Sequence, residues 1–141
     1  MIALARSSKH QKHRPRHHRP LLSAAHELAA LHTARLNGSL CRARRAELIH
    51  GIDCWAATQL PPAHGGAHMH TESLGAVIDR LARYAVLARI ALTTDTTELE
   101  LHHAWKRLAE LALGYCDMAS ELAAGLRRLP DLGDPALTEP G

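Results

Sequence analysis

The sequence lacks several features that mark common classes of protein. It contains no phenylalanine, and aromatic residues make up 3% of its 141 residues. No apolar run approaches the roughly 18 residues that a membrane-spanning helix needs, and the apolar start at residues 1–5 is too short for a secretory signal. We therefore expect a cytoplasmic protein that has no membrane partner.

The sequence has three cysteines, and none of them lies close to another. Cys41, Cys54 and Cys116 are odd in number and form no CxxC pair, which argues against a disulfide framework or a zinc ribbon. The absence of a disulfide framework favours a protein that resides in a reducing compartment. Cys54 follows Ile52 and Asp53 directly before a tryptophan, and Cys116 follows a tyrosine, so we expect both to be small core residues.

Acidic residues are absent from the first 20 positions, which carry six basic residues. The other 121 residues hold 11 basic and 14 acidic side chains, so the net charge of +3 belongs to this segment. Residues 6–20 also contain two prolines and no large apolar side chain, which predicts a disordered basic tail over residues 1–20. A nucleic-acid-binding arm is one interpretation, and a dispensable extension is the favoured one. Residues 133–141, rich in proline and glycine, predict a second disordered tail.

Residues 21–60 have the apolar spacing of a helix, with leucine, isoleucine and tryptophan recurring every three or four positions. Asn37-Gly38 lies in the middle of this stretch and could turn the chain. Because the apolar pattern resumes almost in phase, we favour one long helix, with a kink or a split near Asn37-Gly38 as the alternatives. Pro61-Pro62 ends it, and residues 63–70 predict a mobile loop.

Two further helices follow. Thr71 is a good N-cap for the second, whose apolar seam steps by four and three through Leu74, Ile78, Leu81, Ala85, Ala88 and Leu92. Residues 93–100 offer two capping boxes for the third, Asp95 with Glu98 and Thr97 with Glu100. Its apolar pattern continues until Pro130.

These segments predict an all-α protein with one domain over residues 21–132, an up-down bundle of three long helices. A core without phenylalanine and rich in alanine buries little area per residue, so a homo-oligomer is expected. Four aromatic side chains lie on or beside the apolar seams and are expected to anchor the packing: Trp55, Tyr84, Trp105 and Tyr115.

Two pairs of carboxylates have a spacing that suggests metal chemistry. Glu72 and Asp79 are seven residues apart, as are Glu110 and Asp117, so each pair lies on one face of its own helix. If the two faces meet, four carboxylates could bind a divalent metal for phosphate chemistry. In the alternative interpretation these charges decorate solvated faces and pair with arginines, such as Arg107 in the same polar stripe. No other cofactor is predicted.

Motifs for nucleophilic catalysis are absent. There is no GxSxG and no nucleotide P-loop. Two ExxH motifs, Glu47 with His50 and Glu100 with His103, have the spacing of di-iron bundles, but chance explains them in a chain with 12 histidines.

Three segments together resemble a known family. RRAELIHGIDCW (44–55), HTESLGAVIDRLA (70–82) and HHAWKRLAELALGYCDMASELAAGLRRLP (102–130) are similar to an uncharacterised all-helical bacterial family, mainly actinobacterial and DUF4254-like, over about residues 21–132. The resemblance implies a fold without implying a reaction. It also implies that certain residues recur: Asp53, His70, Thr71, Glu72, Gly75, Asp79, Arg80, Leu108, Tyr115, Arg128, Leu129 and Pro130.

Candidate site residues follow from these two sets. The catalytic candidates are His70, Glu72, Asp79 and Arg80, and the binding candidates are Asp53, Arg107, Tyr115 and Arg128. Buried ion pairs that fix helix register would give the same pattern.

The favoured function is a small helical binding or accessory module, dimeric or partnered with another protein. The alternative is a metal-assisted hydrolase or transferase acting on a nucleotide or other phosphorylated metabolite, with His70 as acid or base and Arg80 and Arg128 as phosphate clamps. A second alternative is nucleic-acid binding through residues 1–20.

Overall fold

The computed structural model describes residues 19–36 and 42–131, which form four α-helices and one pair of short strands. In chain order these are α1 (Arg19–Leu36), α2 (Arg42–Gln59), β1 (His68–Met69), α3 (Leu74–Thr93), α4 (Glu98–Ala123) and β2 (Arg127–Arg128). The predicted helical character is confirmed. No helix in the described part of the chain is long and apolar enough to cross a membrane. The two predicted tails lie outside the described residues, except for residues 19 and 20, which belong to α1.

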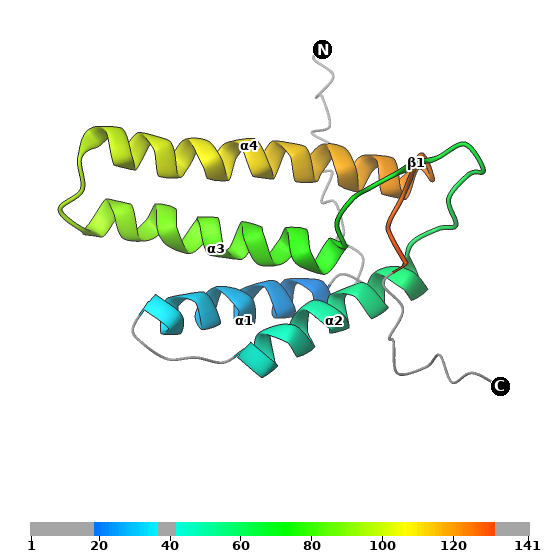
Figure 1. Cartoon of the computed structure of the whole chain (residues 1–141), viewed down its shortest axis with the longest axis horizontal. Coiled ribbons are helices and arrows are strands. Elements are labelled where there is room, and N and C mark those ends of the chain that lie inside the picture. Colours follow the sequence, from blue (N-terminus) through cyan, green and yellow to red (C-terminus); the bar gives the residue numbers. More distant parts are fainter. Residues whose placement is uncertain (1–18, 37–41, 132–141) are drawn as a thin grey trace, which may run out of the picture.

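The single long helix favoured over residues 21–60 is wrong. α1 and α2 contact each other and run in opposite directions (Figure 1). Residues 37–41, which include Asn37-Gly38, lie outside the described residues. A straight helix of that length would span about 60 Å, twice the length of a 20-residue helix, so half of its leucines would have no partner helix to pack against. Folding back lets both halves pack against α3.

α3 is the central helix of the bundle. Figure 1 shows α4 on one side of α3, and α1 and α2 on the other, with successive helices running in alternate directions. The backbone of α3 comes close to the other three helices, whereas the backbone of α4 comes close to no described helix except α3. One apolar cluster joins all four: Leu28, Leu48, Ile52, Ala56, Leu74, Val77, Ile78, Ala82, Met118 and Leu122.

The start and the seam of α3 differ from the prediction. Ser73 is the N-cap in place of Thr71, and its Oγ accepts a hydrogen bond from the Ala76 amide at 3.1 Å. Ala85 of the expected seam is exposed, whereas Val86 is 2% exposed. Because α3 is covered from two sides, its buried surface is wider than one seam.

α4 begins as predicted but ends early. Thr97 and Glu100 form the expected capping box. The helix stops at Ala123, although its apolar spacing continues to Pro130, because Gly125 adopts a left-handed conformation with φ of 72°. The amides of Gly125 and Leu126 turn back to the carbonyls of Leu122 and Glu121, which closes the helix end.

The segment after α4 pairs with the segment before α3, in a stretch where no strand was predicted. β1 and β2 are parallel, with His68 opposite Arg127 and Met69 opposite Arg128. The amide of His70 also donates to the Arg128 carbonyl at 2.7 Å. The expected mobile loop over residues 63–70 is therefore held to the end of α4 by backbone hydrogen bonds.

Candidate functional site

Asp79 joins three helices. It lies on α3 with 5% of its surface exposed, and its side chain faces α1 and α2. Its Oδ1 is 2.8 Å from Nε2 of His32 on α1. Arg45 of α2 donates to both carboxylate oxygens, from Nε at 3.0 and 3.1 Å and from Nη2 at 2.5 Å. The carboxylate thus accepts hydrogen bonds from two elements that are distant in sequence.

The hydrogen bonds keep Asp79 ionised. Burial alone would raise the pKa of the Asp79 carboxyl, but the hydrogen bonds from Arg45 and His32 act in the opposite direction and leave the pKa below its ordinary value. The same contact raises the pKa of Arg45. The geometry is that of a buried ion pair between helices, the pattern that the sequence analysis gave as the alternative to a catalytic site.

The other three catalytic candidates do not join Asp79. Glu72 forms an ion pair with Arg80, and both side chains are more than one-third exposed. His70 turns its Nδ1 to the backbone of Glu72, 2.8 Å from the carbonyl oxygen. These contacts brace the first turn of α3, while Asp79 points to the opposite helices.

The four predicted metal ligands are also in separate places. Glu110 is 3.7 Å from Lys106, one turn away on α4. Asp117 is exposed on the same helix, whereas Asp79 is buried against α1 and α2. No group of three or more histidine, cysteine, aspartate or glutamate side chains in the described part of the chain is arranged to hold a metal ion.

A groove of about 610 Å³, here called the α2–β2 groove, lies between the C-terminal half of α2, the start of α3 and the segment from β2 to Asp131. Its apolar lining is Ala56, Ala57, Leu60, Pro61, Pro62, Ala63, Leu74, Leu122, Leu129 and Pro130. Its polar lining is His50, Asp53, Cys54, Ser73, Arg127, Arg128 and Asp131. Two of the four predicted binding residues, Asp53 and Arg128, are among them.

Asp53 is fixed by a close approach between α2 and α3. Its Oδ1 accepts a hydrogen bond from the Gly75 amide at 2.7 Å, which satisfies one of the free amides at the start of α3. A Cβ at Gly75 would overlap the carbonyl oxygen of Ile49 and lie 2.9 Å from Asp53 Oδ1. The glycine therefore allows the contact that positions Asp53 at the groove wall.

Arg127 and Arg128 reach the groove from β2. Arg127 forms an ion pair with Glu121 of α4. Arg128 donates from Nε to the Ala67 carbonyl at 3.2 Å, and its two terminal amino groups have no hydrogen bond with the described residues. Arg128 can therefore offer the N–H donors of both terminal amino groups to a ligand.

His50 and Cys54 were missed as groove residues. Cys54 is exposed, with Sγ 3.4 Å from Nε2 of His50, one turn earlier on α2. The expectation that Cys54 and Cys116 are core residues is wrong, because both lie on outward faces of their helices. Cys41 lies outside the described residues. The spacing of four between His50 and Cys54 was visible in the sequence, but it did not show that a groove lies beside that helix face.

The remaining binding candidates lie on α4, away from the groove lining. Arg107 is exposed. Tyr115 packs partly buried against the apolar cluster, and burial raises the pKa of its hydroxyl, with a smaller contribution from Cys116. Trp105, expected to anchor the packing, is 43% exposed because α4 is covered by α3 alone.

Comparison with known proteins gives one match. The model of a family described as proteins of unknown function, DUF4254, matches residues 39–130, a segment that contains α2, α3, α4 and both strands. α1 precedes the matched segment. No curated protein and no solved structure matches the chain.

Proposed function

The chain belongs to the DUF4254 family of proteins of unknown function, and we propose that it is a small helical binding module whose ligand lies in the α2–β2 groove. The volume of about 610 Å³ carries this proposal. Sites for small molecules usually enclose roughly 300–1,000 Å³, have mostly apolar walls and present a few polar groups that orient the ligand. The α2–β2 groove has each of these properties.

The polar groups indicate the kind of ligand. The terminal amino groups of Arg128 suit an anionic group such as a carboxylate or phosphate. Asp53 uses Oδ1 for the Gly75 amide, and its Oδ2 accepts no hydrogen bond from the described residues, so it can accept one from a hydroxyl or an amine. We therefore propose a metabolite with an apolar body, one anionic group and one donor.

Self-association is the second part of the proposed function. α4 packs against α3 alone among the described helices, and its outer surface exposes 43% of Trp105 and 68% of Leu113. Large apolar side chains on a helix with a single neighbour are typical of a surface that a partner covers. A second copy of α4 would supply such a cover.

A thermal-shift screen tests the groove. The panel consists of nucleotides with and without Mg²⁺ or Mn²⁺, sugar nucleotides, acylated amino acids and short fatty acids. A ligand that binds only the folded state must raise the melting temperature. Ala57→Phe fills the groove from an exposed position on α2, and Ala85→Phe adds the same side chain on an exposed position of α3 that does not line the groove.

We expect at least one ligand class to stabilise the wild type and Ala85→Phe but not Ala57→Phe. A ligand that stabilises all three proteins equally binds elsewhere and contradicts the groove as the site. A panel without any stabilising compound contradicts the proposed ligand class.

A further inference from the structure

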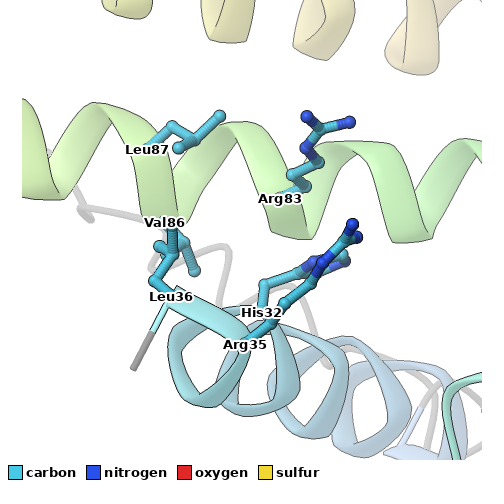
Figure 2. A pocket seen from close by; sticks show the side chains of 6 residues that line it. All are labelled: His32, Arg35, Leu36, Arg83, Val86 and Leu87. Carbon is cyan, nitrogen blue, oxygen red and sulfur yellow. The ribbon is translucent and has the colours of Figure 1, made fainter. Parts of the chain in front are cut away.

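A second and smaller cleft lies between α1 and α3, on the side of Asp79 away from the α2–β2 groove residues. It has a volume of about 260 Å³ and is lined by His32, Arg35, Leu36, Arg83, Val86 and Leu87 (Figure 2). None of these residues lines the α2–β2 groove. The cleft is therefore a separate place on the protein from the groove of the proposed function.

The polar lining of this cleft is entirely basic. Neither Arg35 nor Arg83 forms an ion pair or hydrogen bond with any residue in the ranges 19–36 and 42–131. No described carboxylate lines the cleft. The nearby carboxylate of Asp79 is already bound by Arg45 and His32, so it does not neutralise the two arginines.

Figure 2 shows how the side chains are directed. His32 and Arg35 both rise from α1 toward α3, with the imidazole beside the arginine side chain. Arg83 extends from α3 on the side away from α1. Its long side chain is exposed, so a rotation about its side-chain bonds can bring the guanidinium over the mouth of the cleft.

His32 is the buried polar residue of the lining. It is 5% exposed, and its Nε2 contacts the ionised Asp79, so Nε2 carries a hydrogen. Nδ1 has no hydrogen-bond partner among the described residues. Because the ring lines the cleft, its NMR signals report on what occupies the cleft.

We propose that the α1–α3 cleft binds a small oxyanion, the phosphate or carboxylate group of a metabolite. Arg35 donates to the oxyanion from α1, and Arg83, the other arginine of the lining, supplies a second positive charge from α3. The volume is several times the roughly 30 Å³ of liquid that one water occupies, which leaves room for the oxyanion and a small organic group. Leu36, Val86 and Leu87 supply an apolar wall for that group.

The test uses the full chain and inorganic phosphate, titrated at constant ionic strength against chloride so that screening is unchanged. Calorimetry measures the affinity, and NMR of the ¹⁵N-labelled histidine rings reports on His32. The variants are Arg35→Ala and Arg83→Ala, with Arg89→Ala as the matched control, an exposed arginine on α3 that does not line the cleft. Because neither arginine has an ion pair or hydrogen bond with the described residues, their replacement removes no such contact from this part of the chain, and we expect the variants to fold. A second titration with acetate in place of phosphate tests whether the cleft prefers a carboxylate or a phosphate group.

We expect saturable binding in the wild type and Arg89→Ala, and an affinity lower by at least about tenfold in Arg35→Ala, the typical loss of one charge-assisted hydrogen bond. Arg83→Ala should weaken binding in the same direction, and the His32 ring signal should move only in proteins that bind. Binding of acetate with the same dependence on Arg35 supports a carboxylate as the natural group. Equal affinity in wild type and Arg35→Ala, an unmoved His32 signal at saturation, or the lack of saturable binding to both anions overturns the proposal.

Discussion

Replacing Asp79 with alanine should destabilise the protein mainly through His32. The His32 side chain is 5% exposed, so its Nε2–H would lose its acceptor inside the bundle, and a buried donor left unpaired costs about 1–3 kcal/mol. The Arg45 side chain is 42% exposed and can return to water, so this half of the interaction is comparable to a surface salt bridge worth about 0–1 kcal/mol. We therefore expect the free energy of unfolding to fall by about 1–4 kcal/mol.

Urea denaturation followed by circular dichroism measures this change. Arg45→Ala should lower the free energy of unfolding by about 1–3 kcal/mol, because the buried Asp79 carboxylate then keeps only its contact with His32. Asp117→Ala, on an exposed position of α4, is the control and should stay within about 0.5 kcal/mol of the wild type. The reasoning is refuted if either Asp79→Ala or Arg45→Ala stays within the control's range.

Three further predictions concern pH, close packing and assembly. The pKa of Asp79 is lowered in the folded protein, so its stabilising contribution is present above the ordinary aspartate pKa of about 3.9 and is lost as the pH falls through the folded value. Acid should therefore reduce the difference in unfolding free energy between wild type and Asp79→Asn. A difference that stays constant from neutral pH to about pH 2 would contradict this prediction. Gly75→Ala should lower the free energy of unfolding by about 1–3 kcal/mol, because the new Cβ overlaps the Ile49 carbonyl. Gly114→Ala, where a Cβ meets open space on α4, should raise the free energy of unfolding by about 0.5–1 kcal/mol. If urea denaturation shows equal effects for the two variants, α2 and α3 are not in close contact. Leu113→Glu should lower the mass found by sedimentation velocity toward that of one chain, and a wild type that already sediments as a monomer contradicts self-association through α4.

Local spacing predicted α3 and α4 well, because their apolar side chains recur with the period of a helix and their starts carry capping residues. It failed where the chain turns within a continuous pattern. The apolar residues on both sides of Asn37-Gly38 remain in phase, so the pattern alone did not distinguish one helix from two helices packed on the same neighbour. In the same way, Leu126 and Leu129 continue the spacing of α4, although Gly125 has already ended the helix.

The candidate site was predicted in part. Asp53 and Arg128 were identified through the family resemblance, and both line the α2–β2 groove. The resemblance also identified Asp79, but its partners His32 and Arg45 are 47 and 34 residues away in the sequence, beyond the reach of any spacing argument. The clefts themselves arise from how helices pack against one another, and no single segment encodes them.

The central place of α3 has a practical consequence for how the protein is divided. The segment that the family shares begins at residue 39, after α1 has ended, so a fragment cut at that boundary would keep every shared motif and yet leave one side of α3 uncovered. Asp79 would then lose its contact with His32, and Val86, 2% exposed in the full chain, would meet water. The segment matched by the family model therefore lacks one helix that packs against α3 in this chain. Expression of this protein for biochemical work should begin no later than Arg19.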